Sequence, residues 1–152
     1  MSSPTSSRRP EHKHAVAITP NRDQFRELSA APDGGAVVML NLLKFKPHAD
    51  DDAGTTGEDA YRAYGDAAVA MIEERGGQVI WAGHADQILI GDPAEDWDQV
   101  LLVQYPSRAA FLNMVAQPEY QDAHQHRESG LERTVVVACT PRLDRIAELG
   151  GK

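Results

Sequence analysis

Apolar residues recur along the chain with two periods, one typical of strands and the other of helices. Four runs rich in Val, Ile and Leu have the two-residue period of a strand: residues 36–45, 78–91, 98–105 and 133–140. The stretches that follow the first and third runs repeat apolar residues every three or four positions, as the buried side of a helix does. The order strand, helix, strand, strand, helix, strand predicts an α+β fold of the ferredoxin-like βαββαβ type, with a four-stranded antiparallel sheet.

Residues typical of helix ends mark where the two main helices begin and stop. Thr55, followed three residues later by Glu58, has the spacing of a capping box, and Gly76 ends the same helix. Ser107 is the expected cap of the second helix. Pro118 interrupts that helix, because proline has no amide hydrogen and clashes with the preceding turn.

Composition divides the chain into three parts. Residues 1–16 are polar and lack periodicity, which is typical of a disordered tail because such a segment buries too little apolar surface to offset its ordering entropy. Residues 17–35 are expected to form an N-terminal helix and turn, with Thr19 as the cap and Pro20 in the first helical position. Residues 36–150 then form one ferredoxin-like dimeric barrel domain with a single hydrophobic core.

The first and last strands carry apolar side chains on both faces. In the run 36–45, Val37, Met39 and Leu43 point to one face, and Val38, Leu40 and Leu42 point to the other. Two helices packed on one face of the sheet leave the other face uncovered. A second copy of the chain is the simplest cover, so we expect a homodimer.

Charge and chain composition exclude several kinds of partner. The 152 residues include 15 Lys and Arg against 23 Asp and Glu, a net charge of −8. Nucleic acids and anionic membranes bind clustered basic residues, so neither is an expected partner. No apolar run approaches the roughly 20 residues of a membrane-spanning helix, and the first residues lack the apolar centre of a secretory signal. A cytoplasmic location is therefore expected, and the lone Cys139 excludes an internal disulfide.

Several motifs together resemble DUF1330, a bacterial family of domains of unknown function. The resemblance covers about residues 36–140 and rests on VVMLNLLKF from Val37, the pair Tyr61 and Tyr64, YPSRAAF from Tyr105 and QPEYQDAHQHR from Gln117. That family belongs to the dimeric α+β barrel superfamily, which also contains antibiotic-biosynthesis monooxygenases, muconolactone isomerases and haem-containing chlorite dismutases. The resemblance implies a homodimer and a small-molecule pocket between the sheet and the helices of each protomer, and it names no reaction.

Three polar residues on predicted elements are candidates for catalysis. Asn41 interrupts an apolar strand, where its amide must bond either to neighbouring backbone or to a ligand carbonyl. His84 and Asp86 are two apart on one predicted strand, so His84 is either a general base polarised by Asp86 or a surface or dimer contact. Arg127, on the last predicted helix, is either an anchor for an anionic or enolate oxygen or a member of a surface ion pair.

Four aromatic and histidine side chains are candidates for substrate binding. Tyr61, Tyr64 and Trp81 either line an aromatic pocket or belong to the core. His124 shares a helix face with Arg127, and it is also the one residue suited to be an axial haem ligand. The sequence has no zinc pattern, phosphate loop or dinucleotide fingerprint, so we predict neither a cofactor nor a metal.

These features favour an enzyme that works without a cofactor. The leading hypothesis is an oxygenase- or isomerase-like reaction on a small aromatic or carbonyl-bearing metabolite, which needs one base and one partner for a developing oxyanion. The alternative is a non-catalytic dimer that binds a small molecule or a protein. The polar loop Lys46 to Gly57 is a candidate lid over the pocket.

Overall fold

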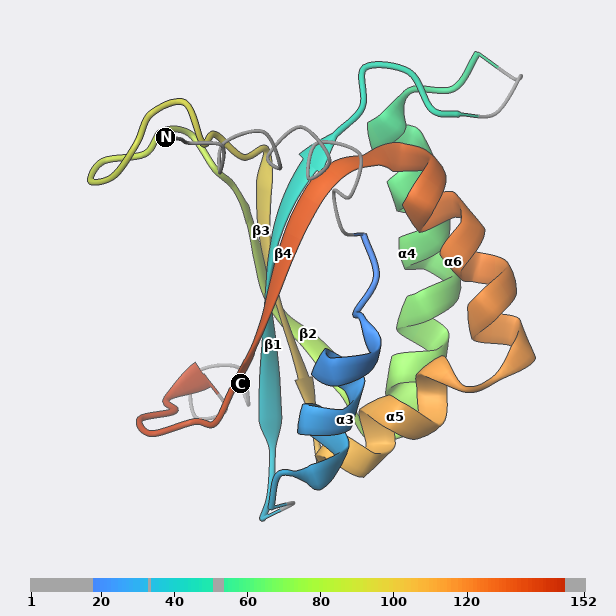
Figure 1. Cartoon of the computed structure of the whole chain (residues 1–152), viewed down its shortest axis with the longest axis vertical. Helices are drawn as coiled ribbons and strands as arrows, with labels where there is room; N and C mark the ends of the chain where they lie inside the picture. Colours follow the sequence, from blue (N-terminus) through green and yellow to red (C-terminus); the bar gives the residue numbers. More distant parts are fainter. Residues whose placement is uncertain (1–17, 33, 51–53, 147–152) are drawn as a thin grey trace, which may run out of the picture.

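The described residues form a four-stranded antiparallel sheet with its helices on one face (Figure 1). This computed structural model describes residues 18–32, 34–50 and 54–146, so the predicted tail of residues 1–16 lies outside it. The strand order is β2-β3-β1-β4, and the predicted ferredoxin-like α+β fold is confirmed. In chain order the elements are α3 (Arg22–Ala30), β1 (Val37–Phe45), α4 (Gly57–Glu74), β2 (Gln78–His84), β3 (Gln99–Tyr105), α5 (Arg108–Val115), α6 (Pro118–Gly130) and β4 (Leu131–Cys139).

The second pair of helices begins as the sequence predicts. Ser107 caps α5, with its side-chain oxygen accepting the Ala110 amide hydrogen at 3.0 Å. Pro118 stands in the first turn of α6, where its missing amide hydrogen costs no helical bond. The two helices therefore form one bent layer over the sheet.

The caps of α3 and α4 differ from the predicted ones. Thr56, rather than Thr55, caps α4, and its hydroxyl accepts the Asp59 amide at 3.1 Å. In α3 the cap is Asn21, whose side chain and that of Gln24 each accept the other's amide at 2.8 Å. This reciprocal capping box satisfies two exposed amides at once, so the helix begins after Asn21 and not at the predicted Pro20.

Strand β2 is shorter than the predicted run of residues 78–91. It ends at His84, which is paired with Gln99 at the start of β3. The amide of Ala85 still donates to the carbonyl oxygen of Asp98 at 3.0 Å, and the residues between these two form a loop. The tip of the loop exposes 82% of Leu89 and 91% of Ile90 to solvent.

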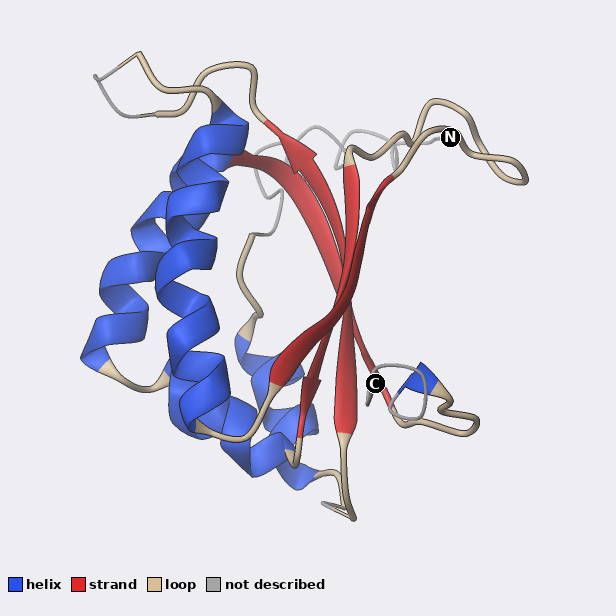
Figure 2. Ribbon diagram, turned by 180° about the vertical axis from the view of Figure 1, so that it is seen from behind, coloured by secondary structure: helices blue, strands red, loops and turns tan. Residues whose placement is uncertain are grey.

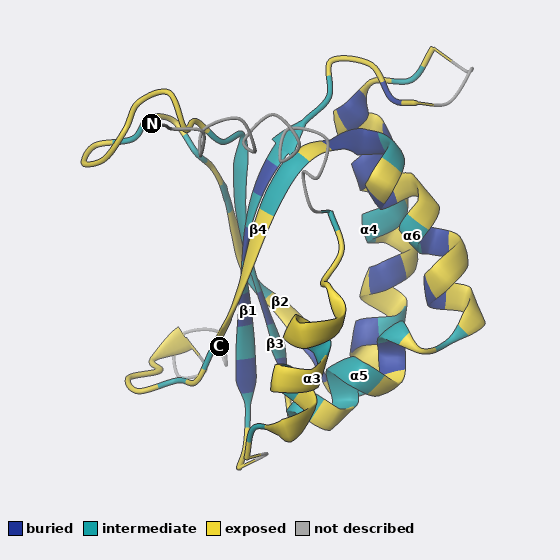
Figure 3. Ribbon diagram, in the orientation of Figure 1, coloured by how far each residue is buried: buried dark blue, intermediate teal, exposed yellow. Residues whose placement is uncertain are grey.

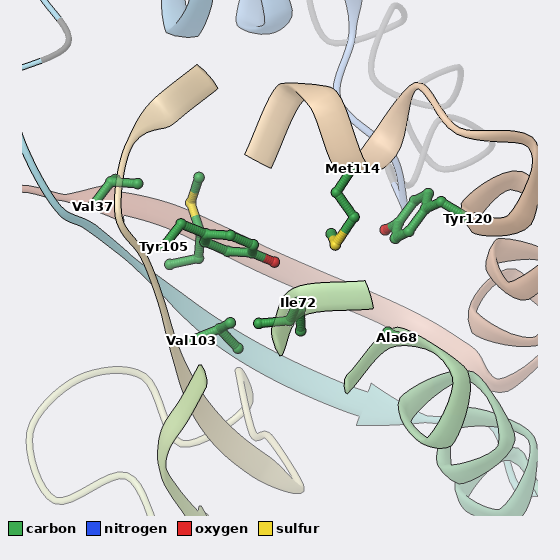
Figure 4. Close-up of a cluster of buried hydrophobic side chains, with 8 residues drawn as sticks. Val37, Ala68, Ile72, Val103, Tyr105, Met114 and Tyr120 are labelled. Carbon is green, nitrogen blue, oxygen red and sulfur yellow. The ribbon is translucent and has the colours of Figure 1, made fainter. Parts of the chain in front are cut away.

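The inner face of the sheet holds the hydrophobic core. The largest cluster joins β1 and β3 to the three helices α4, α5 and α6, and most of its side chains are drawn in Figure 4. Its buried members are Val37, Met39, Ala68, Ile72, Val103, Tyr105, Met114 and Tyr120. By contrast α3 contains no buried residue and lies along the edge of the helical layer (Figure 3).

The outer face of the sheet is apolar, and within the described ranges no helix packs over its centre (Figure 2). Exposed fractions reach 51% for Trp81 and 46% for Val137. The register places these side chains on that face: Val38, Leu40, Leu42, Trp81, Val100, Leu102, Val135 and Val137. The two-sided apolar pattern predicted for the first and last strands is therefore present. None of the helices in the described ranges is long and apolar enough to cross a membrane.

Candidate ligand site

A cavity of about 1270 Å³ lies between the inner face of the sheet and the helices. Met39, Asn41 and Val103 form part of its floor, and side chains of α4, α5 and α6 form its walls. Phe25 and Leu28 of α3 border its open side. Small-molecule sites in proteins are typically clefts of roughly 300–1,000 Å³ with a mostly apolar lining, so this cavity is large enough to bind one.

Four tyrosines from three elements converge on the cavity. Tyr61 and Tyr64 of α4 have ring centres 5.3 Å apart, and Tyr64 meets the ring of Tyr120 edge to face at 6.0 Å. The hydroxyl oxygens of Tyr64 and Tyr120 are 3.0 Å apart, so one donates to the other. Tyr105 of β3 completes the group. These rings provide an apolar wall with several hydroxyl groups.

Burial keeps the phenols of Tyr61 and Tyr64 protonated. It raises the pKa of Tyr61 to about 12, and it raises the pKa of Tyr64 well above the usual value of 10.0. The neighbouring charge of Arg127 opposes the shift in both cases. At neutral pH the hydroxyl groups of Tyr61 and Tyr64 are therefore uncharged.

Helix α6 directs Arg127 and His124 toward the same cavity. Arg127 is only 6% exposed, its Nη1 donates to the carbonyl oxygen of Ile18, and its guanidinium carbon lies 6.0 Å from the centre of the Tyr64 ring. His124 lies one turn earlier, with Nδ1 3.8 Å from a carboxylate oxygen of Glu128. Burial and, second, the charge of Arg127 lower the pKa of His124 below 6.5, while Glu128 opposes the shift. His124 is therefore a neutral imidazole at pH 7.

Asn41 of β1 is 9% exposed on the floor of the cavity. Its side-chain nitrogen donates to the carbonyl oxygens of Met39 at 3.0 Å and Leu101 at 3.4 Å. Both amide hydrogens are thus used by the backbone, one of the two alternatives that the sequence left open. The side-chain oxygen accepts no hydrogen bond from any residue in the described ranges, and it is the atom that Asn41 can offer to a ligand.

His84 and Trp81 do not line this cavity. His84 lies near the exposed end of edge strand β2 and borders a smaller pocket together with Lys46, Glu58 and Asp98. The prediction that Asp86 continues the same strand is wrong, because β2 ends at His84, and the described side chains form no ion pair between the two.

Trp81 lies on the outer face because β2 contains a bulge. The register shifts between Val79 and Trp81, so Val79 is opposite Val103 on the inner face and Trp81 is opposite Leu102 on the outer face. The indole packs over Gly83, since a Cβ atom there would lie 2.5 Å from the ring. Simple alternation would have put both side chains on the same face.

The candidate lid, Lys46 to Gly57, is tied to the end of α6 rather than to the cavity. The amide of Lys46 donates to the carbonyl of Gly130 at 2.8 Å, and that of Asp50 donates to the carbonyl of Ser129 at 3.1 Å. Residues 51–53 of this loop lie outside the described residues, and the described ones do not line the cavity. Its role as a lid stays a prediction.

Five of the seven candidate residues therefore surround one cavity: Asn41, Tyr61, Tyr64, His124 and Arg127. Two of the tyrosines that line the cavity, Tyr105 and Tyr120, were not among the candidates. Tyr120 precedes His124 by four positions, and this helical spacing was an available signal. Tyr105 ends a buried strand, where a tyrosine is not distinguishable by sequence from a core residue. Across the described ranges, no cluster of three His, Cys, Asp or Glu side chains is arranged for a metal ion.

Comparison with known proteins identifies the relatives of this chain. Residues 53–140 match the family described as Domain of unknown function (DUF1330). A protein of unknown function from Rhodopseudomonas palustris, RPA0582, has a crystal structure with a TM-score of 0.80 and 36% sequence identity, covering 85% of this chain and 99% of that one. No curated protein matches this sequence.

Two more distant structures have lower sequence identity to this chain. At3g17210 from Arabidopsis thaliana has a TM-score of 0.52 at 17% identity, covering 71% of this chain and 97% of that one. SnoaB, described as a cofactor-independent oxygenase from Streptomyces nogalater, has a TM-score of 0.49 at 14% identity, covering 73% and 97%. The likeness to At3g17210 shows a common fold and carries no conclusion about chemistry.

Proposed function

The chain belongs to the DUF1330 family, whose description names no reaction, and we propose its function from the cavity. The protein is a cofactor-independent enzyme that isomerises or oxygenates a small aromatic or carbonyl-bearing metabolite. The observation that carries this proposal is the convergence of a neutral imidazole and a buried guanidinium, His124 and Arg127, on one tyrosine-lined cavity. A base beside a cation is the arrangement that removal of a proton next to a carbonyl requires.

The chemistry follows from the charges of these groups. His124 takes a proton from the carbon next to the substrate carbonyl. The electron pair of the broken C–H bond forms a C=C bond, and the π electron pair of the C=O bond moves onto the oxygen. Arg127 and the tyrosine hydroxyls stabilise the resulting enolate. Return of the proton to another carbon completes an isomerisation, and an electron-rich enolate is also the kind of substrate that reacts with oxygen without a cofactor. His124 has this role rather than His84, because His84 does not line the cavity.

The proposal is tested by proton exchange at carbon. Two enolisable aromatic ketones, phenylacetone and phenylpyruvate, are incubated with the protein in deuterated water, and loss of the proton signal next to the carbonyl is followed by NMR. We expect exchange of one or both ketones to be accelerated by the wild type and reduced roughly 100-fold or more in His124→Gln, the scale of general-base catalysis.

The matched control is His126→Gln, because His126 is an exposed residue of the same helix that does not line the cavity. It should keep the wild-type rate. Equal exchange rates in wild type, His124→Gln and protein-free buffer would exclude the enzymatic proposal for this class of substrate.

The alternative function is a non-catalytic protein that binds the same kind of small molecule. The engagement of both Asn41 amide hydrogens by the backbone favours it, because those hydrogens are then not available to polarise a carbonyl. Saturable ketone binding by the wild type with no exchange would support this alternative.

We also propose that two copies of the chain associate through the outer face of the sheet. The support is physical: this face is continuous, apolar and partly exposed on all four strands, with Trp81, Leu102, Leu40 and Val137 in successive strands at one level. An exposed apolar surface of this kind is stabilised when a matching surface covers it.

A further inference from the structure

Among the described residues, a buried positive charge in the cavity has no carboxylate to neutralise it. Arg127 is 6% exposed, and within the described ranges no Asp or Glu lies close enough to form an ion pair with it. Glu128, the adjacent acid, contacts His124 instead. The carboxylates that border the cavity, Glu27, Glu58 and Asp66, are solvent-exposed residues at its rim. A buried guanidinium is costly without a partner, so its presence here points to an anion as ligand.

The one bond that Arg127 makes to a described residue leaves most of its donors without a described partner. A guanidinium has five N–H groups, and the bond to the carbonyl oxygen of Ile18 uses one of them. That carbonyl is neutral and belongs to the segment leading into α3, a helix without buried residues. A carboxylate or enolate oxygen accepts from a guanidinium more strongly than a peptide carbonyl does, often through two parallel bonds.

Asn41 supplies the second contact. Its nitrogen is held by Met39 and Leu101, which determines how the amide is oriented and leaves its oxygen as a buried acceptor on the cavity floor. A buried acceptor without a donor costs free energy, and a ligand hydroxyl supplies that donor. The site is therefore suited to a ligand with an oxyanion at Arg127 and a hydroxyl group at the side-chain oxygen of Asn41.

The cavity walls restrict the shape and polarity of the part of the ligand that contacts neither Arg127 nor Asn41. Tyr61, Tyr64, Tyr105 and Tyr120 line the cavity together with Phe111. Aromatic side chains bind planar rings by offset and edge-to-face contacts. The ligand body that fits this lining is flat and largely apolar.

We infer that the ligand is a small aromatic acid with a phenolic or enolic hydroxyl, whose carboxylate pairs with Arg127 and whose hydroxyl donates to the side-chain oxygen of Asn41. This inference rests on the proposed function and narrows its substrate class.

Calorimetric binding to the full-length protein tests both contacts. The probes are benzoate, its three monohydroxylated isomers, phenol and the uncharged analogue benzamide. We expect benzoate to bind more tightly than benzamide, and at least one hydroxybenzoate to bind about tenfold more tightly than benzoate, because a good hydrogen bond to a buried acceptor is worth about that factor.

Two variants separate the contacts. Arg127→Met should weaken every carboxylate probe roughly 10- to 100-fold and leave phenol unaffected, as expected for a charge-assisted hydrogen bond. Asn41→Leu should abolish the preference for the hydroxylated acid while leaving benzoate within about twofold. The matched control is Arg75→Met, because Arg75 also donates to a backbone carbonyl, that of Met71 at 3.0 Å, but does not line the cavity. It should bind all probes as the wild type does.

The outcomes separate this inference from the proposed function. Benzamide binding as tightly as benzoate, or carboxylate binding unchanged in Arg127→Met, overturns the assignment of an acid, although ketone exchange would still support an enzyme. A hydroxybenzoate preference that persists in Asn41→Leu overturns the hydroxyl contact. Failure of all six probes to bind the folded wild type overturns the inference as a whole, and the exchange assay then decides the proposed function separately.

Discussion

Arg127 and Arg75 both donate to a backbone carbonyl oxygen, yet their surroundings differ. Arg75 also donates to the side-chain oxygen of Asn113 at 2.9 Å and lies 3.6 Å from the carboxylate of Glu74. Arg127 is more deeply buried and has no acidic partner among the residues that the structure describes. A buried charge without an acidic partner costs stability.

This difference predicts opposite effects on the free energy of unfolding. Arg127→Met should leave it unchanged or raise it, because an apolar side chain of similar length replaces an unpaired charge. Arg75→Met should lower it by about 1 kcal/mol, the usual net value of a lost hydrogen bond. Urea denaturation of the two variants measures both. A loss of more than about 2 kcal/mol in Arg127→Met would instead indicate a structural role.

His124 makes the proposed activity depend on pH. Burial, followed by the charge of Arg127, lowers the pKa of the imidazole below 6.5. The neutral, basic form is therefore present at pH 7 and is lost as the pH falls through this lowered value. The exchange rate should decrease on the acid side with an apparent pKa below 6.5, and Arg127→Met should move that pKa upward. An NMR titration of the imidazole with a pKa above 6.5 in the wild type would contradict this.

At the scale of elements, α4 and α6 approach each other at two glycines. A Cβ atom on Gly57 would lie 2.6 Å from the carbonyl oxygen of Gly130, and one on Gly130 would lie 3.1 Å from Cβ of Ala60. The same pair connects to the sheet, since the Gly130 carbonyl accepts the amide of Lys46. This close contact determines how the helices that carry Tyr61 and Arg127 are placed around the cavity.

Alanine substitutions at Gly130 and at Gly65 should therefore have opposite effects on stability. Gly130→Ala should lower stability by about 1–3 kcal/mol, the usual cost of overpacking. Gly65→Ala, in the middle of α4 with no atom within 4 Å of the added Cβ, should raise stability by about 0.5–1 kcal/mol. Urea midpoints compare the two directly. A Gly130→Ala protein as stable as Gly65→Ala would show that the helices can separate at little cost.

At the scale of the whole molecule, the sheet separates two apolar surfaces with different surroundings. The inner one faces the helices and the cavity, whereas the outer one has no helix of the described ranges over its centre (Figure 2). The proposed homodimer would cover the outer surface and leave the cavity of each copy on the opposite side of the sheet. Association and ligand binding should then be separable by mutation.

Light scattering tests the association. The wild type should have a mass of twice 16.6 kDa at micromolar concentration. Val137→Arg, which places a charge on a strand residue 46% exposed on the outer face, should shift the mass toward one chain. Ala70→Arg, on the exposed side of α4, is the control and should remain at the wild-type mass. A wild-type mass of a single chain would refute the dimer.

Most of the local structure was determined by the sequence alone. Alternating apolar residues identified β1 and put Asn41 on the same face as Met39, and Ser107 and Pro118 marked the starts of α5 and α6. These features depend on interactions between residues a few positions apart, so the local sequence is sufficient to predict them. The spacing of His124 and Arg127 on one helix face is of the same kind.

Tertiary structure alone decided which side chains meet. Strand β2 ends at His84, opposite the first residue of β3, so Asp86 lies in the following loop and not on the strand. The bulge between Val79 and Trp81 reversed the face of the tryptophan, and one inserted residue in a strand leaves no mark on composition. Tyr105 joined the cavity because strand pairing places it opposite Val37 on the inner face of the sheet. Strand pairing and packing of the helices on the sheet bring together residues far apart in the chain. The fold therefore decides which residues line the cavity.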